Sequence, residues 1–208
     1  MRRISIGMAF LALTLAAPAF AHEGSATDRT SQAQFHDAMR KLWEDHVTYT
    51  AFFYKAAVHG GDDVGKVAER LLRNQDDIGD AVKPFYGEAA GNRLAALLRE
   101  HILAAADLVK AAKAGDATGQ DQASRKFFEN GDDLAAFLSS ANPHWPRKTL
   151  EVALQGHLQM VIEQVVATLH TDTAAAIAAY DRGHEHMLMV ADVLSSGIVK
   201  QFPERFER

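Results

Sequence analysis

The sequence predicts an all-α protein made of three tandem αα-hairpins of about 55 residues each, packed as a six-helix bundle. Three observations support this fold class. Apolar residues recur every three or four positions from Phe35 onward, which is the spacing of one face of a helix. Sustained alternation of apolar and polar residues, the pattern of a strand, is nearly absent. The pattern of helices and short turns also repeats along the chain, at the scale of tandem helical units.

The N-terminal segment 1–21 is typical of a secretory signal peptide. Arg2 and Arg3 precede an apolar stretch, and residues 19–21 (Ala-Phe-Ala) match the small-x-small pattern of a cleavage site. We therefore expect a periplasmic or secreted protein. No later stretch approaches about 18 uninterrupted apolar residues, so we expect no stable membrane span once the signal peptide is removed.

Residues 22–33 are polar and contain Gly, Ser and Thr, so we expect a flexible lead-in, followed by a single all-helical domain over 34–208. The first predicted helix begins with the apolar stripe at Phe35 and ends at the glycine turn over 59–62. The second predicted helix stops near Pro84, because proline removes a backbone donor and clashes with the preceding turn.

The second and third hairpins follow the same plan. Gly115 separates the third and fourth helices, the Asn142-Pro143 break ends the fourth, and Thr171-Asp172 separates the fifth and sixth. The approximate bounds of the three repeats are 35–85, 91–142 and 148–201. A single hairpin cannot bury its apolar face alone, so the three must pack together.

Polar residues occupy matching positions within these apolar stripes. Those on the odd-numbered helices, separated by nearly equal intervals, are His46, His101 and His157. Those on the even-numbered helices, separated by two equal intervals of the same length, are Asn74, Asn130 and His186. Burying a polar group without a partner costs about 2 kcal/mol or more, so these side chains must bond to one another, to backbone, to water or to a ligand. We expect them to meet in one internal layer.

Two interpretations of this layer are open. In the first, it binds a transition metal or a small polar ligand, because imidazole nitrogen suits Cu, Zn, Ni and Fe and helical bundles build metal sites from facing helices. The predicted metal ligands are His46, His101, His157 and His186. The predicted supporting polar residues are Asn74, Asn130, Asp77, Asp133 and His184. In the second, the imidazoles and amides pair only with each other and specify the packing of the hairpins.

Composition excludes several classes of protein. The chain contains ten histidines and no cysteine, which excludes disulfides, cysteine-based zinc sites and iron–sulfur clusters. Its formal net charge of −5 and its scattered basic residues argue against a nucleic-acid partner. No phosphate-binding glycine loop, dinucleotide fingerprint or nucleophile elbow is present. We therefore expect a binding module or a structural protein, with a metal-dependent enzyme that uses the same histidines as a third alternative.

Several distinctive motifs occur in order over residues 40–206. They are Leu42-Trp43…His46-Val47, Leu71-Leu72-Arg73-Asn74-Gln75-Asp76-Asp77-Ile78, Glu100-His101-Ile102, Ser140-Ala141-Asn142-Pro143 and Tyr180-Asp181…His184…His186-Met187-Leu188. As a set they resemble an uncharacterised family of bacterial all-helical proteins that are often exported. The resemblance implies a single helical domain and implies no established activity.

Overall fold

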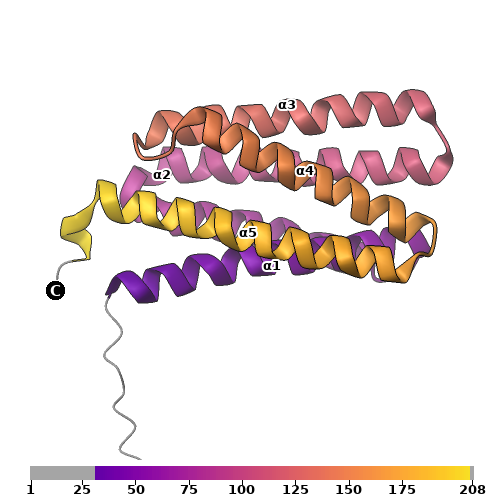
Figure 1. The fold of residues 1–208 in the computed structure, drawn as a ribbon, viewed down its shortest axis with the longest axis horizontal. Helices are drawn as coiled ribbons and strands as arrows, with labels where there is room; N and C mark the ends of the chain where they lie inside the picture. The colour runs from indigo at the N-terminus through magenta and orange to yellow at the C-terminus, as the bar shows by residue number, and fades with distance from the viewer. Residues whose placement is uncertain (1–30, 207–208) are drawn as a thin grey trace, which may run out of the picture.

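The structure is a computed structural model that describes residues 31–206, and it contains no strand within that range. Its elements are α1 (Ser31–His59), α2 (Val64–Ala114), α3 (Ala117–Ala141), α4 (Arg147–Leu169), α5 (Thr173–Gln201) and the short 3-10 helix η1 (Pro203–Arg205) (Figure 1). The all-α prediction is confirmed. Among the described residues, no helix combines the length and apolar character needed to cross a membrane. The predicted signal peptide over 1–21 and most of the predicted lead-in over 22–33 lie outside the described residues.

Short turns join neighbouring helices where the sequence supplies glycine or a capping residue. Gly115 ends α2 with a left-handed φ of 67°, which glycine adopts without steric strain. Asp116 then caps α3 by accepting a 2.9 Å hydrogen bond from the Gly119 N–H. Asp172 caps α5 in the same way, accepting from the Ala175 N–H at 3.0 Å.

The described residues form five helices rather than the six expected, because the second and third predicted helices are joined in α2. Gly87 alone has non-helical torsions inside this element, with φ of 83° and ψ of 167°. A positive φ of this kind is open to glycine and strained for other residues, so one residue is enough to bend the helix sharply. No separate loop is therefore needed after Pro84, which lies inside α2.

The two arms of α2, residues 64–86 and 88–114, pack against each other on either side of this bend (Figure 1). Two glycines allow the close approach, since a Cβ added at Gly79 would lie 2.6 Å from the Gly91 carbonyl oxygen. Farther along the arms, Arg99 pairs with Asp76 at 3.1 Å.

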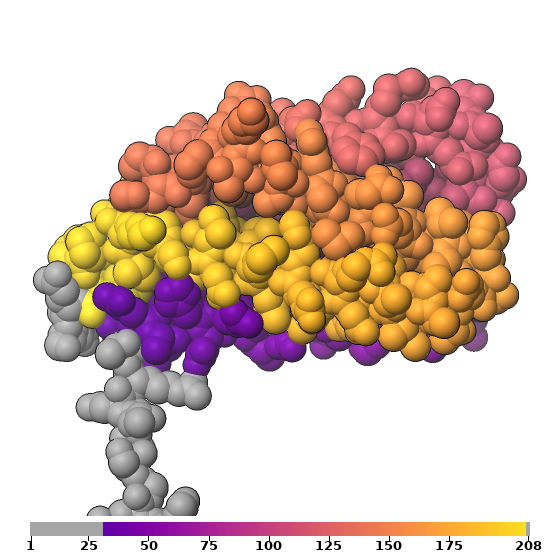
Figure 2. All heavy atoms as spheres, viewed as in Figure 1, coloured from indigo at the N-terminus to yellow at the C-terminus, as the bar shows by residue number. Residues whose placement is uncertain are grey.

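The helices close into a ring. α2 packs on α1 and α3, α4 packs on α3 and α5, and α5 packs back on α1. On the face drawn in Figure 2, α5 runs along the molecule with α4 and α3 above it, and α1 emerges below α5. The described ends also meet, because Ser31 Oγ donates to the Phe206 carbonyl at 2.6 Å and the Phe206 ring stacks on Phe85 near the bend of α2.

The apolar core has two parts. The Trp43 cluster draws residues from all five helices, including Trp43, Leu98, Leu134, Leu154 and Met187. The Phe127 cluster includes Phe53, Ile102, Phe127, Leu158 and Val165. Along α4, for example, Leu154 belongs to the first cluster, Leu158 belongs to the second, and His157 lies between them. The junction of the two clusters is therefore where the polar residues of the stripes are buried.

Candidate metal centre

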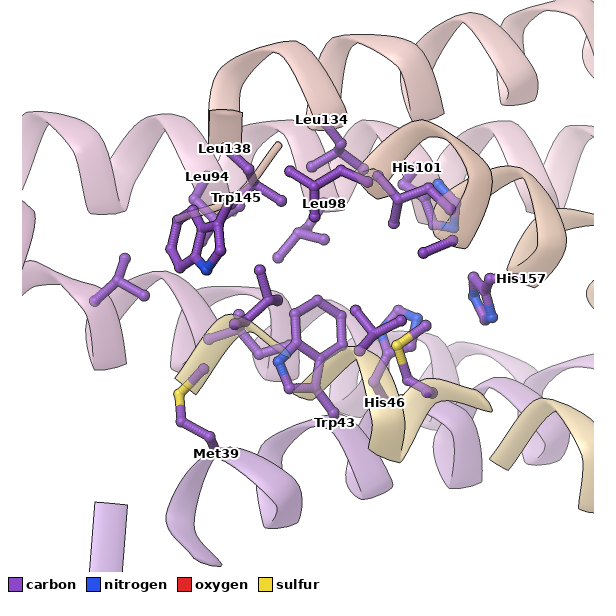
Figure 3. A pocket seen from close by; sticks show the side chains of 18 of the residues that line it. Met39, Trp43, His46, Leu94, Leu98, His101, Leu134, Leu138, Trp145 and His157 are labelled. Atoms are coloured by element: carbon purple, nitrogen blue, oxygen red, sulfur yellow. The ribbon is translucent and has the colours of Figure 1, made fainter. Parts of the chain in front are cut away.

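Three histidines from three helices converge between the two apolar clusters. α1 supplies His46, the second arm of α2 supplies His101, and α4 supplies His157. Each is at most 5% exposed, and one ring nitrogen from each lies within 4.8 Å of the other two. Figure 3 shows the three rings gathered toward one end of a cavity, with Trp145 toward the other.

The hydrogen bonds of a neighbouring amide determine which nitrogen of His46 carries the proton. Gln75 Nε2 donates to the Leu71 carbonyl at 2.7 Å and to Asn74 Oδ1 at 3.2 Å, so the amide oxygen of Gln75 faces His46. This oxygen can only accept, and it lies 3.2 Å from His46 Nδ1. His46 Nδ1 is therefore the N–H donor, and Nε2 keeps its lone pair.

A different amide holds His101 in the same tautomer. Asn130 Nδ2 donates to the Leu97 carbonyl at 3.0 Å, which turns Asn130 Oδ1 toward His101 Nδ1 at 3.1 Å. His101 Nδ1 donates to this oxygen, and Nε2 again keeps its lone pair. Histidines that ligate metals have this arrangement, in which one ring N–H bonds to an oxygen and the other nitrogen binds the ion.

His157 has no such partner. Neither Nδ1 nor Nε2 bonds to any group within residues 31–206, although the side chain is only 4% exposed. An unsatisfied buried polar group destabilises a protein by about 1–3 kcal/mol. Of the three converging histidines, His157 is thus the one whose hydrogen-bonding capacity the described chain leaves unused.

Burial keeps the three imidazoles neutral at neutral pH. Desolvation lowers the pKa of His46 to about 4, against a smaller opposite effect of the bond to Gln75. Desolvation, assisted by the neighbouring His46, lowers the pKa of His101 to about 3. Burial and the neighbouring histidines also hold the pKa of His157 well below its usual value. Neutral imidazole is the form that binds a metal, so metal binding at neutral pH displaces no proton from these rings.

An internal cavity of about 30 Å³ adjoins the three histidines. Apolar side chains of the Trp43 cluster form most of its other walls, among them Trp43, Leu98, Leu134 and Met187. Within residues 31–206, no Asp or Glu lines it. A space of this size holds one or two water-sized molecules, and its apolar walls offer them few hydrogen bonds.

A smaller space of about 20 Å³ borders His157 and the buried Thr50, whose hydroxyl is likewise without a partner in the part of the chain that the structure describes. It shares Gln164 and Tyr180 with an open groove of about 610 Å³ between α1, α4 and α5. Tyr180 also lies across the α1–α5 contact, where its hydroxyl is 3.3 Å from Thr48 Oγ1. The small space beside His157 therefore adjoins the groove at this seam.

The polar residues predicted on the even-numbered helices lie on α2, α3 and α5 of the structure, and they bond mainly to backbone carbonyls. All three donate to the carbonyl of the residue that comes four before a converging histidine. The bonds are Asn74 to Leu42 at 3.0 Å, Asn130 to Leu97 at 3.0 Å and His186 to Ala153 at 2.7 Å. Although His186 was predicted as a ligand, the converging group consists of His46, His101 and His157 without it.

The other predicted supporting residues lie toward the surface. Asp77 is half-buried, with a carboxylate oxygen 3.9 Å from Arg70, and Asp133 is exposed. His184 stacks on Tyr180, and its Nε2 lies 3.4 Å from Glu44. If Asp77 or Asp133 lay beside the three neutral imidazoles, its carboxylate would lose its hydration without gaining a positive partner. This cost explains why both carboxylates lie toward the solvent.

Two residues at this centre were not predicted from the sequence. Gln75, rather than the adjacent Asn74, bonds to the His46 ring, and Met187 lines the cavity that the three histidines also line. The signal for Gln75 was a second polar residue next to Asn74 on an apolar stripe. Met187 gave no such signal, since a methionine on a stripe is an ordinary core residue.

Comparison of the chain with protein-family models, with curated proteins and with solved structures found no match in any of the three. The chemistry of the three imidazoles is therefore the basis for assigning a function.

Proposed function

We propose that the protein binds one transition-metal ion, of the group Cu, Zn, Ni and Fe, through the ring nitrogens of His46, His101 and His157. The observation that carries this proposal is His157, whose two nitrogens are buried beside two other imidazoles without a partner among the described residues. The amide-held tautomers of His46 and His101 support it, because both leave a lone pair on Nε2.

The spacing of the nitrogens is compatible with an ion. Metal–nitrogen distances of about 2.0–2.1 Å put tetrahedral ligand nitrogens about 3.4 Å apart. The three nitrogens here lie within 4.8 Å of one another. Each ring therefore has to move by less than about 1 Å, which side-chain rotation in the adjoining cavity allows.

The alternative is a structural layer that only specifies helix packing. The bonds from His46 to Gln75 and from His101 to Asn130 favour it, since both residues are satisfied without a ligand. It gives no account of His157, because replacing a buried, unpaired imidazole by an apolar side chain would stabilise such a layer.

We also infer that the chain is organised as three hairpins around this centre, with α2 contributing one arm to each of the first two. Three side-chain bonds to carbonyls four residues before a converging histidine, made from equally spaced positions along the chain, support this organisation. With the signal peptide expected over residues 1–21, the proposed role is that of an exported metal-binding module.

The test is the metal content of the purified protein and its His157→Leu variant, with His186→Gln as the matched control. Leucine fills an apolar site without leaving a polar group unpaired, so the variant is expected to fold and to bind no metal. Glutamine retains a donor for the Ala153 carbonyl, and the control is expected to bind one ion per chain like the parent. A parent protein that takes up none of the four metals would overturn the proposal.

A further inference from the structure

Met187 brings a soft donor to the cavity that adjoins the three histidines. It lies on α5, is 1% exposed, and lines the same internal cavity as His46, His101 and His157. Its neighbour two residues along, Met189, is 60% exposed and therefore belongs to the surface. Met39, the other buried methionine of the cavity, lies away from the three rings (Figure 3). Met187 and the three imidazoles would together supply four donors of the type that Cu(I) prefers.

The charge of the site narrows the choice of ion. Three neutral imidazoles contribute no negative charge, and no carboxylate within residues 31–206 lines the cavity. The Born penalty for moving an ion into an apolar interior rises with the square of its charge, so a divalent ion pays about four times the penalty of a monovalent one. An uncharged ligand set in apolar surroundings therefore favours a monovalent soft ion.

The position of Met187 in the repeat also places it near the centre. Gln75, Gly131 and Met187 follow one another at equal intervals, so they occupy the same position in the three repeats. From the first of these positions, the Gln75 side chain reaches His46 at 3.2 Å. From the second, glycine contributes no side chain, and a Cβ there would lie 3.0 Å from Leu158. The third position supplies the sulfur.

Building on the metal site proposed above, we propose that its ion is Cu(I), bound by His46, His101 and His157 and by the thioether of Met187 as the fourth donor.

The experiment measures Cu(I) and Zn²⁺ affinities separately for the full-length protein. Cu(I) is titrated anaerobically under reductant against a chromophoric Cu(I) chelator, and Zn²⁺ against a chromophoric zinc chelator. The variants are Met187→Leu, His157→Leu and, as the matched control, Met39→Leu. Met39 lines the same cavity but precedes His46 by seven residues, about 10 Å along α1, and Figure 3 shows it away from the three rings.

The parent protein is expected to bind one Cu(I) per chain and to prefer it to Zn²⁺. Met187→Leu is expected to lower the Cu(I) affinity by about tenfold or more, and to change the Zn²⁺ affinity by less than about threefold, because zinc gains little from a thioether. Met39→Leu is expected to leave both affinities unchanged, and His157→Leu to abolish both. X-ray absorption of the Cu(I)-loaded parent protein is expected to show one sulfur neighbour, which tests Met187 without any substitution.

Each other outcome contradicts a separate claim. An unchanged Cu(I) affinity in Met187→Leu, or a copper shell without sulfur, overturns the role of Met187. A parent protein that binds Zn²⁺ as tightly as Cu(I) overturns the choice of a monovalent ion and leaves the histidine site standing. If the parent protein binds neither ion, nor Ni nor Fe, the proposed function itself fails.

Discussion

His101 and His157 lie on neighbouring parts of the same buried cluster and are similarly buried, but the chain surrounds them differently. Asn130 accepts the Nδ1–H of His101 and bonds to the Leu97 carbonyl, so one amide satisfies both groups. On α5, His186 donates to the Ala153 carbonyl but makes no hydrogen bond to the imidazole of His157. A layer that served packing alone would satisfy every member, and this difference favours a ligand from outside the chain at the third histidine.

Acidification tests the three imidazoles together and has the largest expected effect. Native His46 and His101 take up a proton only near pH 4 and pH 3, because burial lowers their pKa values. In the unfolded chain, histidine takes it up near pH 6.5. Between these values the unfolded state binds more protons, so the stability of the metal-free protein is complete above about pH 6.5 and falls by of order 5 kcal/mol toward pH 4.

Urea titrations of the metal-free protein from pH 7 to pH 4 measure this loss. His157→Leu removes one of the three titrating groups and is expected to show a weaker dependence on pH. A urea midpoint that stays constant over the range would contradict the burial of the imidazoles as neutral groups.

Removing the amide of Asn130 has the next largest expected effect. Asn130→Leu leaves the His101 Nδ1–H unpaired and takes one donor from the Leu97 carbonyl, so we expect a loss of about 3 kcal/mol in the free energy of unfolding. The control is Asp133→Asn on the exposed face of the same helix, with an expected change within about 0.5 kcal/mol. Both free energies of unfolding are measured by urea denaturation at pH 7.5. If Asn130→Leu lost no more stability than Asp133→Asn, Asn130 would not be a stabilising partner of His101, and His101 would no longer differ from His157.

Replacing His157 has the smallest expected effect on stability, and with the opposite sign. His157→Leu removes a buried polar group that has no partner among residues 31–206, so we expect the metal-free protein to gain about 1 kcal/mol. Thermal unfolding of the metal-free variant and parent checks the sign. A loss of stability larger than about 1 kcal/mol would mean that His157 has a hydrogen-bond partner in the metal-free protein. His157 would then be a satisfied histidine like His101.

The burial of His46, His101 and His157 could be predicted because each lies on an apolar stripe, and such a stripe faces the interior of a bundle. This periodicity predicts that a residue is buried, and the nearly equal spacing of the three histidines along the chain predicted that they lie at a similar depth. The glycine and aspartate turns at 115–116 were accessible for a similar reason, since their torsions and caps depend on local residues.

The remaining features depend on geometry that periodicity does not encode. His186 also lies on an apolar stripe, but the direction of its side chain turns it to the Ala153 carbonyl instead of the cavity. Whether Asn74 or Gln75 reaches the His46 ring depends on side-chain length and on the local distance between α1 and α2. The bend of α2 depends on the torsions of a single residue, Gly87, whereas Pro84 had predicted that the helix stops there.

The depth of the three histidines also has a kinetic consequence. Because they are 2–5% exposed beneath packed helices, the proposed ion would reach or leave them only while the bundle is transiently open. The seam closed by Tyr180 and Thr48 adjoins the space beside His157, so its opening is the route that we expect for such exchange. A loaded molecule would keep its ion through dilution for as long as the seam stays shut, independently of how tightly the ion is bound at equilibrium.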